Sequence, residues 1–234
     1  MKDESFAESL FAALITGDRR RARGLMQQSC DGGTPAESLA HDVFWPVLEE
    51  INTLYRKDQL STLAHHYATR LLRSLVDQAQ VHYTEQTPRG RSILMFCGAS
   101  ESDELAAQLV ADLAEADGYE VHFGGGGIAN DEILEEAGRH APDILLMFSA
   151  APSDAPNIRQ LIDTIRTIGA CAKTQFVVGG GVFNRADGLA EEIGADLWAK
   201  SPAELLEKLV GQSERRAGTD QRTVGRNRRT SRAA

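Results

Sequence analysis

The sequence lacks the features that mark membrane and secreted proteins. No stretch approaches the ~18–20 consecutive apolar residues that a membrane-spanning helix needs. The first residues hold neither the basic nor the apolar segment of a secretory signal, and the three cysteines are far apart and form no CxxC pair. We therefore expect a cytoplasmic protein that makes no membrane contact and no disulfide framework.

The motifs of several common enzyme classes are also missing. There is no GxxxxGK(S/T) phosphate loop and no GxGxxG at the start of a helix, which argues against a mononucleotide site of that type and against a nicotinamide dinucleotide. Neither HExxH nor a recognisable Ser/His/Asp arrangement is present, and no pair of acids has a spacing that indicates catalysis. We do not expect the chain to be an enzyme.

Charge is unevenly distributed along the chain. The formal net charge is −9 over 234 residues. Residues 214–234 contain seven arginines and two acids, so this tail carries about +5 and the remainder about −14. An acidic body argues against a broad nucleic-acid surface, which would need a basic face. The sequence predicts a basic, disordered tail over 214–234, and any contact with nucleic acid would be made by this tail.

Residues 1–80 have the pattern of a helical bundle. Apolar residues recur at helical spacing in four segments, and Gly17-Asp18 separates the first two. Four helices with short connections predict a small four-helix bundle. Residues 81–90, which include Pro88, predict a linker.

Over residues 91–213 the pattern changes to alternating strands and helices, which predicts a parallel, doubly wound sheet. The predicted strands are Ile93–Phe96, Glu120–Phe123, Ile144–Phe148, Gln175–Val178 and Leu197–Trp198. The predicted helices are Asp103–Ala116, Asp131–His140, Pro156–Ile168, Ala186–Ile193 and Pro202–Leu209. Ligands of such sheets bind beyond the carboxyl ends of the strands.

This layout resembles the cobalamin (B12)-binding modules of corrinoid proteins and of B12-dependent photoreceptors and regulators. In that family a four-helix cap precedes a flavodoxin-like (Rossmann-type) α/β domain with a parallel five-stranded sheet. The resemblance covers about residues 8–210. Within the cap, the segment 55–69 resembles the light-sensor version: Tyr55 stands where that version has Trp, His65 where it has Glu, and His66 where it has His.

In the α/β half, the segment 101–106 resembles the DxHxxG loop of the family. Glu101 stands for the first acid, Asp103 for the histidine and Ala106 for the glycine. The resemblance implies that the histidine is the lower axial ligand of cobalt and that the glycine lets the corrinoid tail pass. The motif is therefore degenerate here. Asp103 would either cap the following helix or take a metal role in place of the imidazole.

Other positions match the family at the ends of the later strands. Ser149 matches the serine of its SxL motif, although Ala151 replaces the leucine, and Gly179-Gly180 matches its GG motif. The segment 194–199, with Trp198, resembles its closing strand. By resemblance, the cofactor-binding candidates are Tyr55, His65, His66, Glu101, Asp103, Ser149, Gly179, Gly180 and Trp198, and His66 is also a candidate metal ligand.

These observations favour a sensor or regulatory module that binds a tetrapyrrole, cobalamin by class, between cap and sheet and signals to a protein partner. Transcription would be regulated through that partner or the tail, and a homo-oligomer is compatible with the sequence. Three alternatives remain open: a haem- or biliverdin-binding relative, a corrinoid methyl carrier, and a cofactor-free interaction module. Asp103 and Ala106 favour the last of these, whereas Ser149, Gly179 and Gly180 argue against it.

Overall fold

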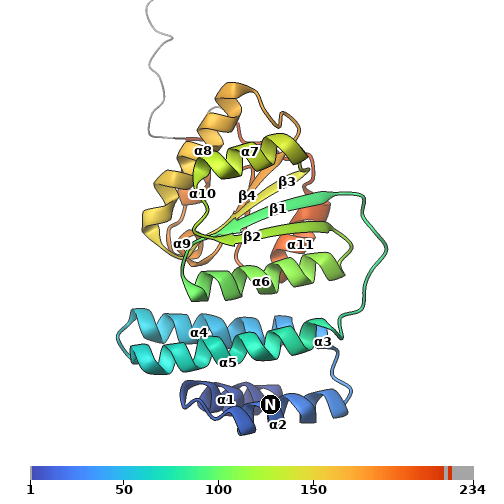
Figure 1. Ribbon diagram of the computed structural model, residues 1–234, viewed down its shortest axis with the longest axis vertical. Coiled ribbons are helices and arrows are strands. Elements are labelled where there is room, and N and C mark those ends of the chain that lie inside the picture. The colour runs from blue at the N-terminus through green and yellow to red at the C-terminus, as the bar shows by residue number, and fades with distance from the viewer. Residues whose placement is uncertain (1, 219–220, 223–234) are drawn as a thin grey trace, which may run out of the picture. The chain divides into compact units, whose positions relative to one another are not determined.

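The computed structural model describes residues 2–218 and 221–222 and is shown in Figure 1. The chain forms two compact units. The helical unit comprises Met1–Gly90 and Ser100–Glu120, and the sheet unit comprises Arg91–Ala99 and Val121–Ala234. The helix after the first strand therefore groups with the helical region, whereas the sequence placed it in one continuous α/β domain over 91–213.

The helical unit contains the predicted bundle. Its elements are α1 (Lys2–Ile15), α2 (Arg19–Asp31), α3 (Ala36–Leu39), η1 (Ala40–Phe44), α4 (Trp45–Arg56), α5 (Thr62–Gln80) and α6 (Glu101–Ala116). Asp18 caps α2 and Ser61 caps α5 through their side chains, which satisfies amide groups that the first helical turn leaves free. Large buried side chains such as Leu14, Leu48 and Leu72 form the centre of the bundle.

The third helix of the bundle is interrupted, which the sequence did not predict. Residues Ala40–Phe44 form a π-helical turn, in which the amide of Trp45 donates to the carbonyl of Ala40. Pro46 follows directly and has no amide hydrogen to offer the carbonyl four residues earlier. The proline thus explains why the regular α-helical ladder is lost at this position.

The segment 81–90 forms neither helix nor strand, but it is not a free linker. The amide of Gln86 donates to the carbonyl of Ala116 at 2.8 Å. Arg89 forms an ion pair of 2.8 Å with Asp117 and donates its amide to Gly118. The segment is therefore fixed along the end of α6.

The sheet unit has the predicted strands: β1 (Ser92–Cys97), β2 (Glu120–Gly126), β3 (Ile144–Phe148), β4 (Gln175–Gly179) and β5 (Leu197–Ala199). Their order is β2-β1-β3-β4-β5, and β1 with β3, β3 with β4, and β4 with β5 pair in parallel. This confirms the flavodoxin-like α/β architecture. The chain changes direction across the sheet between β1 and β3, which is where such sheets bind ligands.

The helices of the sheet unit are α7 (Asn130–His140), the 3-10 turn η2 (Pro152–Asp154), α8 (Ala155–Ile168), α9 (Gly181–Arg185), α10 (Leu189–Ile193) and α11 (Pro202–Gly211). Side chains of α7, α8, α9 and α10 form one apolar core with β1, β3 and β4. The helix predicted over 186–193 is shorter than expected, because Gly188 is in the left-handed conformation and α10 begins after it. Helix α9 was not predicted.

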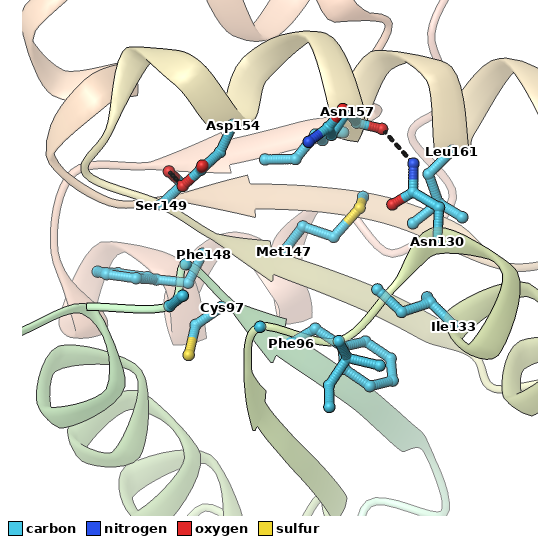
Figure 2. A pocket seen from close by; sticks show the side chains of 15 residues that line it. Phe96, Cys97, Asn130, Ile133, Met147, Phe148, Ser149, Asp154, Asn157 and Leu161 are labelled. Atoms are coloured by element: carbon cyan, nitrogen blue, oxygen red, sulfur yellow. Dashed lines mark hydrogen bonds between the residues drawn. The ribbon is translucent and has the colours of Figure 1, made fainter. Parts of the chain in front are cut away.

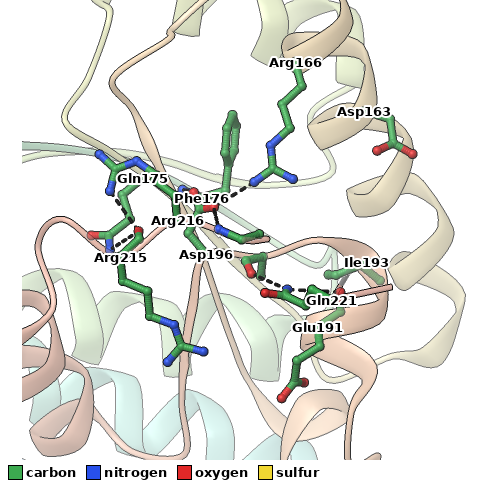
Figure 3. Close-up of polar contacts among 12 residues, drawn as sticks. Asp163, Arg166, Gln175, Phe176, Glu191, Ile193, Asp196, Arg215, Arg216 and Gln221 are labelled. Carbon is green, nitrogen blue, oxygen red and sulfur yellow. Dashed lines mark hydrogen bonds and ion pairs between the residues drawn. The ribbon is translucent and has the colours of Figure 1, made fainter. Parts of the chain in front are cut away.

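The prediction of a disordered tail is wrong for the part that the structure describes. Asp196 is fully buried and accepts hydrogen bonds from the amides of Phe176 and Ala217, each at 2.7 Å, and from Arg166 at 2.8 Å (Figure 3). The side chain of Gln221 donates to the carbonyls of Glu191 and Ala195. We call residues 212–218 with 221–222 the C-terminal strap. Residues 219–220 and 223–234 lie outside the described residues.

Within the described residues, no helix combines the length and the apolar character that crossing a bilayer would require.

Candidate functional site

Asp103 lies in the first turn of α6 and is part of a reciprocal helix cap. The Ser100 hydroxyl accepts the Asp103 amide at 3.0 Å and donates to the Asp103 carboxylate at 2.9 Å. The Asp103 residue is only 3% exposed. Helix α6 therefore begins at Glu101, two residues before the predicted start, and its N-cap is Ser100. Asp103 was expected to cap the helix itself, but it lies inside the first turn, where its carboxylate accepts a hydrogen bond from the capping hydroxyl.

A buried polar chain connects this helix start to the bundle within the helical unit. The Ser102 hydroxyl donates to Oδ1 of Asn52 at 2.5 Å. Nε2 of His65 lies 3.3 Å from the same oxygen. Asn52 was not identified from the sequence. The only signal was a polar residue next to the apolar stripe of α4, four positions after Leu48.

The two adjacent histidines of α5 have different environments. His65 is 8% exposed and its ring stacks on Tyr55, with centroids 4.1 Å apart. Burial lowers the pKa of His65, and the neighbouring His66 lowers it further. The His65 imidazole is therefore a neutral hydrogen-bond donor to Asn52. His66 is exposed, with its ring centroid 6.2 Å from that of His65.

The remaining residues of the helical unit that were predicted to bind the cofactor lie near the start of α6. The Glu101 carboxylate lies 3.5 Å from Arg70, and its carbonyl accepts a hydrogen bond from Arg73. Ala106 is buried. Tyr55, His65, Glu101 and Asp103 are thus gathered around the start of α6. No group of three His, Cys, Asp or Glu residues suited to a metal ion occurs among the residues described, so the assignment of His66 as a metal ligand gains no such support.

In the sheet unit, Ser149 and the Gly179-Gly180 pair lie together at the carboxyl edge. The amide of Ser149 donates to the carbonyl of Gly179 at 3.0 Å. Gly180 has a φ of 103°, and a Cβ there would collide with the carbonyl of Ser149. Only glycine allows this approach of the two loops. The Ser149 hydroxyl donates to Asp154 at 2.7 Å, so the serine also fixes the turn before α8.

Trp198 lies on β5 with cations over its ring. The Arg215 guanidinium is 4.6 Å and the Lys208 ammonium 5.8 Å from the ring centroid. The Lys208 ammonium also donates to the Trp198 carbonyl at 2.9 Å. The indole therefore has partners within the sheet unit, one of them from the C-terminal strap, and its cofactor contact stays a prediction.

The donor set at the start of α6 limits how a corrinoid can bind. The Asp103 carboxylate, already hydrogen-bonded to a serine, stands where the resemblance places an imidazole. Carboxylates suit harder ions than cobalt, for which imidazole is the better ligand. The residues at the start of α6 therefore fit a corrinoid that receives no imidazole from this loop.

Comparison with known proteins extends over nearly the whole chain. A family model described as a B12 binding domain matches residues 91–207, and a second model with the same description matches residues 6–80. The chain is 20% identical over 210 residues to dimethylamine corrinoid protein 1 of Methanosarcina acetivorans, covering 89% of this chain and 97% of that protein. It resembles the solved structure of the Methanosarcina barkeri monomethylamine corrinoid protein with a TM-score of 0.77 at 16% identity, covering 89% of this chain and 99% of that one. With its helical cap and its α/β domain both matched, the chain belongs to the B12-binding domain family.

Proposed function

We propose that this protein binds a corrinoid and serves as the corrinoid-carrying partner of another protein, in the manner of methyl carriers. The observation that carries the proposal is the match of both halves of the chain, in the same order, to B12-binding models. The relatives are a dimethylamine corrinoid protein and a monomethylamine corrinoid protein. They favour the carrier over the sensor that the cap motif suggested.

The corrinoid would be held without an imidazole from the start of α6. When bound, it would supply a cobalt centre capable of methyl transfer. The residues of this chain would hold its periphery: the Gly179-Gly180 pair offers a backbone surface free of side chains, and Ser149 keeps the adjoining loop in place. In this proposal, catalysis of the transfer would belong to the partner protein.

The test is retention of cobalamin by the purified protein. Hydroxocobalamin and methylcobalamin are added in separate samples, unbound corrinoid is removed by gel filtration, and the absorption spectrum is compared with that of the free corrinoid. We expect one corrinoid per chain and a spectrum that lacks the signature of protein imidazole ligation. Haem and biliverdin, added in the same way, should not be retained.

The Asp103→His variant tests whether the start of α6 faces the cobalt of the bound corrinoid. If this position faces cobalt, the variant should retain cobalamin and acquire the spectrum of a nitrogen-ligated form. The matched control is Asp131→His, which introduces the same side chain into the first turn of another helix, α7. Absence of retained corrinoid in the wild-type protein and in both variants would overturn the proposal.

A regulatory role is the second candidate, and one contact favours it. Tyr55 stacks on His65, at the positions where the light-sensor motif has Trp and Glu, and His66 stands exposed beside them. Illumination of the adenosylcobalamin-loaded protein distinguishes the two roles. A light-driven change in elution volume or partner binding, lost in His66→Ala, would favour the sensor. Methyl transfer from the methylcobalamin-loaded protein to a thiol acceptor in the presence of a partner would favour the carrier.

A further inference from the structure

The sheet unit contains a cavity of about 280 Å³ at the carboxyl ends of β1 and β3. Its floor is apolar and includes Phe96, Met147, Ile133 and Leu161 (Figure 2). These residues belong to the core that β1 and β3 share with α7 and α8. The cavity therefore opens on the α7 and α8 side of the strand edge, at the point where the chain changes direction across the sheet.

Two polar side chains, Asp154 and Asn130, lie at opposite ends of the cavity. At one end, Asp154 accepts hydrogen bonds from the hydroxyls of Ser149 and Ser153, and no cation is paired with it in any ion pair of the described structure. At the other end, the Asn130 amide nitrogen donates to the Asn157 carbonyl at 3.0 Å (Figure 2). This bond uses one of the two N–H donors of the Asn130 amide and leaves its Oδ1 as an acceptor for a ligand.

The charges of the side chains that line the cavity determine which class of ligand it can bind. Asp154 is the only carboxylate in the lining, and no lysine, arginine or histidine lines the cavity. A phosphate or carboxylate ligand would find no cationic side chain in the lining and would face Asp154. A cationic donor would pair with Asp154 in a partly desolvated site, where charge-assisted hydrogen bonds are strongest. The volume lies near the lower end for ligand sites, which restricts the ligand to a small molecule.

We infer that this cavity binds a small apolar amine or amidine, with its hydrocarbon part between Phe96 and Met147 and its cationic group at Asp154. This site is separate from the proposed corrinoid carrier function and does not depend on it. The ligand would lie against the loop that carries Ser149. Ligand binding would therefore affect one of the loops that we propose to hold the periphery of the corrinoid.

The test uses three probes of one shape: benzamidine, benzyl alcohol and benzoate. The chain has only four methionines, so methyl-labelled methionine gives a simple NMR spectrum. We expect benzamidine to shift the Met147 methyl signal saturably and to bind at least about tenfold more tightly than the other two probes. The Met95 methyl, which does not line the cavity, should not move. Met147→Leu assigns the signal.

Asp154→Asn is nearly isosteric and keeps an acceptor for Ser149. It should reduce benzamidine affinity to that of benzyl alcohol, whereas Asp187→Asn, an exposed carboxylate of the same unit, should leave it unchanged. Equal binding of benzoate and benzamidine, or no saturable shift of Met147, would overturn the inference. Cobalamin retention is read separately from the absorption spectrum, so failure of this site and failure of corrinoid binding are distinguished.

Discussion

Ser100 caps α6 by accepting the Asp103 amide at 3.0 Å, and its hydroxyl donates back to the Asp103 carboxylate at 2.9 Å. The two residues therefore hold each other in place at the start of the helix. Through this cap the pair contributes to the stability of the helical unit.

Removal of the cap should be measurable as a loss of stability. We expect Ser100→Ala to lower the free energy of unfolding by about 1 kcal/mol, because it leaves the Asp103 amide without its acceptor. Chemical denaturation followed by circular dichroism measures the change. Ser153→Ala, at an exposed position of η2, should change stability by less than about 0.5 kcal/mol. Equal effects of the two substitutions would contradict the capping role.

Gly180→Ala tests the approach of the β3 and β4 loops. We expect it to destabilise the protein by at least about 3 kcal/mol, because the new methyl group would meet the Ser149 carbonyl and φ is 103°. Gly188→Ala shares a positive φ of 79° but has open space around the new atom. It should cost only about 1 to 2 kcal/mol. Thermal denaturation of the two variants gives the comparison, and similar losses would refute the steric argument.

Asp112 on α6 should make stability fall as the pH rises towards neutrality. Its Oδ2 is buried without a hydrogen-bond partner among the described residues, and burial raises its pKa to about 7. Between the ordinary value of 3.8 and about 7, the folded protein holds a proton that the unfolded chain has lost, so raising the pH favours unfolding.

Asp112→Asn removes this titration. We expect it to stabilise the protein at pH 8 by about 1 to 2 kcal/mol, a figure reduced for partial solvent screening, and to change little at pH 4. Denaturation curves over this pH range measure the difference, with Asp187→Asn as an exposed control. A benefit that is the same at pH 4 and pH 8 would show that Asp112 is not the titrating group.

His65 should make stability fall as the pH decreases, which is opposite to the effect of Asp112. Its pKa is lowered, chiefly by burial, so the unfolded chain takes up a proton near pH 6.5 that the folded protein resists. Stability is therefore complete above about pH 6.5 and declines as the pH falls below it. His65→Gln retains an amide donor for Asn52 without the titration. The free energy of unfolding of the variant, relative to wild type, should rise between pH 7.5 and pH 5.

His41 also has a pKa lowered by burial, so His65 is not the only source of lost stability as the pH falls. Only the difference between wild type and His65→Gln reports on His65. If the two proteins lose stability in parallel, the contact of His65 with Asn52 does not suppress its protonation.

The periodicity of the sequence was sufficient for the strands, the bundle and a parallel, doubly wound sheet, whereas the flavodoxin-like architecture was expected from the resemblance alone. Local chemistry also indicated that Asp103 lies at a helix start, where aspartate is favoured, although the cap itself is Ser100. Contacts between distant segments were not accessible in this way. Asn52 reaches Ser102 across 50 positions of the chain, and no local pattern encodes that meeting.

Composition also misled at the C-terminus. The arginines of residues 214–234 resemble those of a solvated tail, but Arg215 covers Trp198 and Arg222 pairs with Asp163 at 2.6 Å. Such pairing depends on where the acids and aromatic rings of the folded domain lie. The π-helical turn before Pro46 could be predicted only in part. The proline in the sequence indicates that the helix is interrupted, but it does not indicate the form of the interruption.

The C-terminal strap also determines where the folded domain can be cut. A chain ended at residue 213, the boundary that periodicity suggests, would lose the Ala217 amide that Asp196 accepts at 2.7 Å and the Gln221 side chain that binds two carbonyls. The fully buried carboxylate of Asp196 would keep Arg166 but lose one of its three donors. A shortened protein made for spectroscopy should therefore extend past Arg222, and any fused tag should follow that residue.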